Sequence, residues 1–162
     1  MMNHFEIKKV TPSDIPLLLS LIKELAEYEK LSHEVVATEE ILQQSFFGAN
    51  ANTEAILGFC DQKPAAFAIY FYNFSSFLGR RGIYLEDLYV KETMRGKGLG
   101  EKMLRHIAKI AKEKNCGRLE WSVLNWNTPA IQFYQRMGAK PMDEWTVYRV
   151  TGEALLRLAS ED

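Results

Sequence analysis

Hydrophobic positions along this chain switch between a spacing of two residues and a spacing of three to four. Residues 5–10 alternate apolar and charged side chains, which is the period of a half-buried strand. Thr11-Pro12-Ser13-Asp14 is a helix-start signal, and the apolar stripe after it predicts a helix that ends near Tyr28. Thr38 is a good N-cap for a short second helix that reaches about Phe47.

A strand pair joined by a tight turn is predicted in the middle of the chain. Residues 53–60 and 65–74 are apolar runs rich in β-branched and aromatic side chains. The segment between them, Asp61-Gln62-Lys63-Pro64, is typical of a hairpin connection. A further strand is predicted over residues 84–90, followed by three glycines, Gly96, Gly98 and Gly100.

The second half of the chain alternates helices and strands. After the glycines a helical apolar stripe runs until Asn115-Cys116-Gly117. The remaining expected elements are a strand over 118–124, a short helix from Asn127 or Thr128 to Gly138, a last strand over 140–150 and a terminal helix over 151–159.

This order of elements predicts an α/β (α+β) fold. The hairpin implies an antiparallel part, whereas the strand over 84–90, the helix after it and the strand over 118–124 form a βαβ unit with parallel strands. We expect one domain over residues 1–162, with a mixed, twisted sheet of about six to seven strands and helices on both faces.

Composition narrows the function classes. The formal net charge is −1, which gives no indication of nucleic-acid or membrane binding. The two cysteines have no metal or redox spacing, the histidines are scattered, and residues 1–6 lack the apolar region that an export signal needs. We therefore expect a cytoplasmic protein without a metal site. No apolar run is long enough to cross a bilayer.

Two carboxylates, Glu86 and Asp87, interrupt the strand over 84–90. One could pair with an arginine across the sheet while the other faces solvent, because adjacent strand residues point to opposite faces. Side chains that break a local pattern also cluster at functional sites. A carboxylate attracts an ammonium group and accepts its proton, so the pair could serve an amine substrate.

The glycine-rich turn predicts an anion site, since backbone N–H groups at a turn before a helix point toward a negatively charged ligand. The spacing is neither that of a dinucleotide-binding fingerprint nor that of a P-loop. A helix entry that needs glycine only for a tight turn is the alternative.

Arg95-Gly96-Lys97-Gly98-Leu99-Gly100 fits the R/Q-x-x-G-x-G/A signature of the Gcn5-related N-acetyltransferase (GNAT) superfamily. Nearly the whole chain resembles that superfamily in length and element order, and it resembles the diamine (spermidine/spermine-like) N-acetyltransferases most. The segments similar to that branch are residues 23–29, 84–87, 126–134 and 136–139.

The resemblance implies acetyl-CoA as cosubstrate and a GNAT-like acyl-CoA N-acyltransferase fold. It places the general base at Glu86 and the general acid at Tyr134, whose alternative role is core packing. It implies a β-bulge near Leu88, Tyr89 and Val90, whose backbone would pair with the pantetheine arm. The cosubstrate would also contact Asn127, which could instead be a plain N-cap, Tyr134, and the residues Arg95, Gly96, Lys97, Gly98, Leu99, Gly100 and Glu101.

Acceptor binding is assigned by the same resemblance to Tyr28, Glu29, Glu86, Asp87 and Trp145, the last on the expected final strand. Tyr28 and Glu29 could equally form a solvated helix end, and Trp145 an ordinary strand residue. Asp87 could tune Glu86, bind the acceptor or brace the sheet.

We therefore expect an acetyl-CoA-dependent N-acetyltransferase that acts on a primary amine of a small diamine, polyamine or thialysine-like molecule. The resemblance further implies a homodimer, and we expect no nucleic-acid or membrane partner. The alternatives are a protein or peptide N-acetyltransferase and a non-catalytic acyl-CoA sensor on the same fold.

Overall fold

The computed structural model describes residues 4–160, which fall into two compact units divided after Leu124. The first unit contains the sheet strands and three of the helices, and the second contains two helices. The elements of the first unit are β1 (Phe5–Lys9), α1 (Ile15–Tyr28), α2 (Glu39–Phe47), β2 (Thr53–Cys60), β3 (Lys63–Ser75), β4 (Arg80–Val90), α3 (Leu99–Glu113) and β5 (Leu119–Trp121). Short 3-10 turns lie at Pro12–Asp14, Ser32–Glu34 and Glu92–Met94, and the second unit has α4 (Thr128–Arg136) and α5 (Gly152–Ala159).

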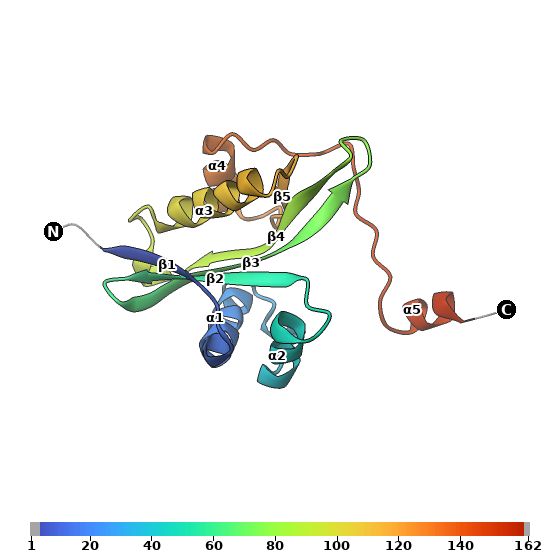
Figure 1. Cartoon of the computed structure of the whole chain (residues 1–162), viewed down its shortest axis with the longest axis horizontal. Helices are drawn as coiled ribbons and strands as arrows, with labels where there is room; N and C mark the ends of the chain where they lie inside the picture. The colour runs from blue at the N-terminus through green and yellow to red at the C-terminus, as the bar shows by residue number, and fades with distance from the viewer. Residues whose placement is uncertain (1–3, 161–162) are drawn as a thin grey trace. The chain divides into compact units, whose positions relative to one another are not determined.

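The sheet of the first unit has the order β1-β2-β3-β4-β5. All neighbouring pairs are antiparallel except β4 and β5, which are parallel and are linked by α3, so the predicted βαβ unit and the mixed sheet are confirmed. Helices α1 and α2 lie on one face of the sheet and α3 on the other (Figure 1). The sheet has five strands among the described residues, fewer than the six to seven expected.

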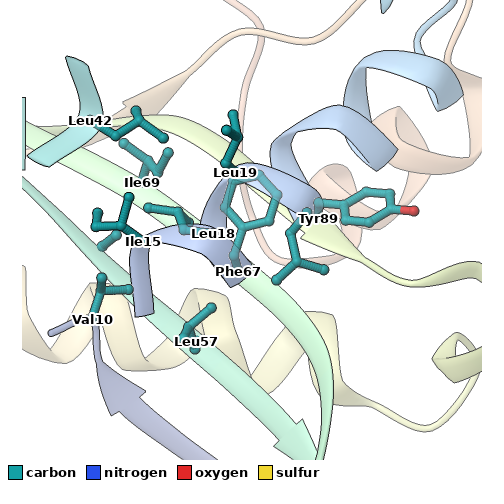
Figure 2. Close-up of a cluster of buried hydrophobic side chains, with 11 residues drawn as sticks. Val10, Ile15, Leu18, Leu19, Leu42, Leu57, Phe67, Ile69 and Tyr89 are labelled. Atoms are coloured by element: carbon teal, nitrogen blue, oxygen red, sulfur yellow. The ribbon is translucent and has the colours of Figure 1, made fainter. Parts of the chain in front are cut away.

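Apolar side chains from both sides of the sheet form the core. On the face of α1, a buried cluster joins that helix to alternate residues of β2, β3 and β4 (Figure 2). Its members include Leu18, Leu57, Phe67, Ile69 and Tyr89. On the opposite face α3 packs so closely on β2 that a Cβ added at Gly58 would lie 3.0 Å from Met103 Sδ. Successive side chains of β2 point to these two faces in turn, as a spacing of two residues predicts for a strand.

The expected last strand over 140–150 is wrong. These residues pair with no strand within the part of the chain that the structure describes, and their side chains are exposed, Trp145 by 76% and Tyr148 by 92%. Alternating apolar residues indicate which side chains share a face, but a strand also needs a neighbour for its backbone groups. The strand expected over 118–124 is present and shorter, at Leu119–Trp121.

No helix among residues 4–160 combines the length and the apolar character needed to cross a bilayer.

The hairpin between β2 and β3 is confirmed, and its turn is strained. Asp61 and Gln62 both have positive φ angles, +51° and +68°, and Cys60 pairs directly with Lys63. A two-residue turn of this kind favours glycine at its second position, because left-handed backbone costs other L-residues roughly 1–2 kcal/mol. Asp61 also has a role of its own, since its Oδ1 accepts a 2.9 Å hydrogen bond from the His4 backbone.

Replacing Gln62 with glycine should therefore stabilise the protein. Relief of the left-handed strain exceeds the entropic cost of glycine, and we expect a net gain of about 0.5–1 kcal/mol in the free energy of unfolding. Chemical denaturation measures it, with Gln62→Ala as the matched control, because alanine keeps the strain. An equal gain in the glycine and alanine variants would contradict this explanation.

Candidate active site

A β-bulge in β4 sets the geometry of the site. In the pairing of β3 with β4, Ile69 lies opposite Asp87 and Tyr70 opposite Leu85, so Glu86 is an extra residue without an opposite partner. The parallel pairing of β4 with β5 ends at the same place, where Leu85 lies opposite Trp121. The resemblance implies a bulge near Leu88–Val90, and the structure has it slightly earlier, at Glu86.

Beyond the bulge, one edge of β4 is open. Lys91 N donates a 2.8 Å hydrogen bond to Ala65 O of β3. Because backbone groups in an antiparallel pair face the partner at every second residue, those of Leu88 and Val90 face the opposite edge, where β5 no longer pairs. The Val90 carbonyl accepts a 2.9 Å hydrogen bond from Arg95 Nε. This edge is available for backbone pairing with an extended ligand.

The two carboxylates at the bulge differ in exposure. Glu86 is exposed, whereas Asp87 is partly buried and lies opposite Ile69, on the sheet face that α1 covers. No ion pair within residues 4–160 includes either side chain, so the arginine partner considered above is not found. Asp87 is therefore a carboxyl group that the sheet buries without a cation.

Burial, together with the negative charges of Glu86 and Glu29, raises the pKa of Asp87 to about 7. Glu29 follows directly after α1, and burial raises the pKa of its carboxyl group as well. The charges of Glu86 and Glu29 thus act on Asp87 beside the end of α1. A pKa near 7 is suitable for a group that accepts a proton from substrate at neutral pH.

Arg95 connects the end of β4 with the end of α1. The Arg95 guanidinium carbon is 4.5 Å from the centre of the Tyr28 ring and 5.7 Å from that of Tyr89. A second link between β4 and α1 is the ion pair of Lys91 Nζ with Glu24 Oε2, at 3.3 Å.

The glycine-rich turn has the conformation that only glycine adopts readily. Gly96 and Gly98 have φ angles of +80° and +84°, and a Cβ at either position would meet nothing within 4 Å, so backbone conformation rather than space requires glycine there. Gly98 is the N-cap of α3 and provides no side-chain cap. The N–H groups of the first turn, which begins at Leu99 and includes Gly100 and Glu101, therefore have no side-chain cap from Gly98, an arrangement that suits an anion.

Charged side chains around the turn differ in their roles. Lys97 is exposed beside it, whereas Glu101 binds Arg105 within α3 at 2.8 Å. Lys102 lies 5.6 Å from the centre of the Phe5 ring. Lys97 is therefore an exposed cation between Gly96 and Gly98.

The second unit contains the other three predicted site residues. Asn127 is the N-cap of α4, and its side chain accepts a 3.4 Å hydrogen bond from Ala130 N. Tyr134 is partly buried on α4, with its ring centre 5.4 Å from that of Phe133. Trp145 is exposed and lies on no strand, which corrects its expected place. The structure brings together, within the first unit, Tyr28, Glu29, Glu86, Asp87, Leu88, Tyr89, Val90 and the turn from Arg95 to Glu101.

Sequence reasoning missed two features of this site. The first is the stacking of Arg95 on Tyr28, and the second is the pair formed by Lys91 and Glu24. Both join side chains far apart in the sequence, so no local spacing could indicate them. The sequence offered two weaker signals, namely Tyr28-Glu29 at the end of the first helix and Lys91 directly after the strand that ends at Val90.

No group of three or more His, Cys, Asp or Glu side chains among residues 4–160 is placed to hold a metal ion.

Comparisons with known proteins agree on one family. A family model described as acetyltransferase (GNAT) matches residues 18–139. A thialysine N-epsilon-acetyltransferase of Bos taurus is 36% identical and covers 96% of this chain and 97% of its own length. A human spermidine/spermine N(1)-acetyltransferase-like protein 1 is 32% identical over 99% of this chain and 24% of its own length. The solved structure of an integron cassette protein from V. cholerae has a TM-score of 0.81 and 30% identity, and covers 97% of this chain and 98% of that one.

The raised pKa of Asp87 predicts a pH-dependent gain in stability for Asp87→Asn. The folded state retains a proton at Asp87 that the unfolded state has lost above its ordinary pKa of 3.8, so stability falls as the pH rises toward about 7. Asparagine removes this penalty, on the order of 2–4 kcal/mol above pH 7 and close to zero below pH ~4.

Thermal unfolding at a series of pH values measures this effect, with the exposed Asp143→Asn as the matched control. The melting temperature of Asp87→Asn should exceed that of the parent at pH 8 by several degrees, and the two should converge at pH 4. A difference that does not change with pH would show that Asp87 is not a buried, protonatable carboxyl group.

Proposed function

Because the chain belongs to the acetyltransferase (GNAT) family, we propose that it transfers the acetyl group of acetyl-CoA to the primary amine of a small diamine, polyamine or thialysine-like molecule. The observation that carries this proposal is the group of carboxylates Glu29, Glu86 and Asp87 beside the end of β4, in the same unit as the glycine-rich turn. An extended aliphatic amine carries one or more positive charges, and this group offers the opposite charge.

The acceptor amine reaches the enzyme protonated, and only its neutral form attacks a thioester. We assign proton removal to Glu86, as the resemblance implies, together with Asp87. The exposed Glu86 meets the ammonium group first, and Asp87, with a pKa of about 7, is partly deprotonated at neutral pH and can accept a proton. Tyr28 and Glu29 bind the rest of the acceptor from the end of α1.

The acetyl donor is held along β4 and at the start of α3. Backbone groups of Leu88 and Val90 on the open edge pair with the pantetheine amides, and one N–H there stabilises the thioester oxygen as negative charge develops on it. The first-turn N–H groups after Gly98 bind the pyrophosphate, with Lys97 beside them and Asn127 as a further contact. Holding both substrates at once supplies much of the rate.

The transfer forms a C–N bond and breaks the C–S bond of the thioester. The ammonium group gives its first proton to the carboxylates, and the attacking nitrogen loses a second as the amide forms. Tyr134 gives its phenolic proton to the sulfur as the C–S bond breaks, and its ordinary pKa of ~10 keeps the phenol protonated until then. The nitrogen's second proton restores the phenol through solvent.

We further propose one catalytic domain over residues 1–162, a homodimer and a cytoplasmic location. The family match over residues 18–139 continues through the division after Leu124, which supports a single domain. A second copy would cover exposed apolar side chains between Met142 and Leu158. Cys60 and Cys116 are free thiols, in agreement with a reducing compartment.

A turnover screen tests the proposed function. Release of CoA thiol from acetyl-CoA is measured with diamines, polyamines, thialysine, other amino acids and N-terminal peptides as acceptors. We expect rapid release with extended small amines and little with peptides. Faster release with peptides would favour a protein acetyltransferase, and CoA binding without thiol release for any amine would favour a sensor.

The assignment of Tyr134 predicts that Tyr134→Phe lowers kcat about 100-fold or more, since general acid catalysis typically contributes that much. The Kd of acetyl-CoA should change little, because the phenylalanine keeps the ring. The matched control is Tyr148→Phe, at a 92% exposed position of the same unit. Unchanged kcat in Tyr134→Phe would rule out the general acid role.

A further inference from the structure

Arg95, the first residue of the signature turn, directs its side chain away from the glycines. Its backbone N–H donates to Glu92 O, and its guanidinium lies over Tyr28 and Tyr89 while Nε donates to Val90 O. The arginine therefore contacts the last residue of α1 and the last residue of β4 at the same time. Sequence similarity assigns this residue only to the cosubstrate turn.

These contacts join the two halves of the proposed site. The Val90 carbonyl lies on the open edge of β4, where the pantetheine arm would pair. Tyr28 precedes Glu29, whose charge acts on Asp87. On its other side Arg95 is followed by Gly96, which begins the phosphate-binding turn.

We infer that Arg95 is a positioning residue through which occupation of the phosphate-binding turn is transmitted to the acceptor-binding end of α1. This inference rests on the proposed function, since it connects the two substrates assigned there. The guanidinium is planar, so it can stack on a ring and donate a hydrogen bond in its plane at the same time. The ammonium group of a lysine cannot make this set of contacts. Lysine at position 95 should therefore keep the positive charge but lose the simultaneous contact with Tyr28 and the Val90 carbonyl.

The ion pair of Lys91 with Glu24 is a second contact between α1 and the segment that follows β4. Glu24 lies about one turn before the end of α1, and its partner Lys91 directly follows β4. Arg95 contacts the last residue of the helix, Tyr28. A shift of the turn on binding a pyrophosphate moves the Arg95 backbone, and Tyr28 follows because its ring lies against the guanidinium. By thermodynamic linkage, an amine bound at Tyr28 and Glu29 must then strengthen cosubstrate binding by the same factor.

The test uses full-length protein labelled with fluorotyrosine, with unacetylated CoA as the probe. The fluorine signal of Tyr28 is assigned by its loss in Tyr28→Phe and is followed during titration with CoA. We expect CoA to shift this signal in the parent and in the control Arg105→Lys, whose side chain binds Glu101 within α3. In Arg95→Lys the shift should disappear although CoA still binds.

A second measurement determines the Kd of thialysine and of spermidine with and without saturating CoA. For the amine that binds, CoA should lower the Kd at least about 5-fold in the parent and less than about 2-fold in Arg95→Lys. An equal Tyr28 response in Arg95→Lys and the parent, or no response in the CoA-bound parent, would overturn the inference while leaving the proposed function intact. Absence of any CoA binding to the parent would overturn the proposed function, and the inference with it.

Discussion

The extra residue in β4 at Glu86 is the constraint on which the rest of the site depends. It ends the parallel pairing with β5 at Leu85, so the backbone of Leu88 and Val90 faces an open edge. It also turns Asp87 toward the face that α1 covers, while Glu86 stays exposed. A regular strand could continue to pair with β5 beyond Leu85 and would leave no open edge. One irregularity thus provides both an acyl-donor edge and an acidic acceptor site.

The charges of this site lower the stability of the folded protein but suit the binding of an ammonium substrate. Asp87 is buried beside Glu86 and Glu29 without a cationic partner, which raises its pKa to about 7 and weakens the folded state at neutral pH. An ammonium substrate would provide the missing charge. Two cations close to this end of the sheet, Arg95 and Lys91, contact Tyr28 and Glu24 instead. Both side chains therefore position α1 and do not neutralise Asp87.

Local pattern predicted most of the first unit, and it failed where the structure depends on partners distant in sequence. The sequence shows the regular spacing of apolar residues in β1 to β4 and in α1 to α3, because one face of each element packs on the core. The bulge leaves the composition of the strand unchanged, so only the resemblance indicated it. Residues 140–150 alternate like a strand, yet the described chain offers them no neighbouring strand. The glycine-rich turn was predictable as contiguous sequence, whereas the stacking of Arg95 on Tyr28 joins two distant segments.

The central claim is that the end of β4 and the start of α3 form one acyl-donor site. Backbone amide NMR of the protein during titration with CoA tests it most directly. We predict that the largest shifts occur at Leu88, Val90 and the amides from Gly98 to Glu101, with little change in the cleft of about 470 Å³ that Phe46, Glu54 and Tyr72 line at the other end of the sheet. Shifts concentrated in that cleft, with Leu88 and Gly98 unaffected, would contradict the account.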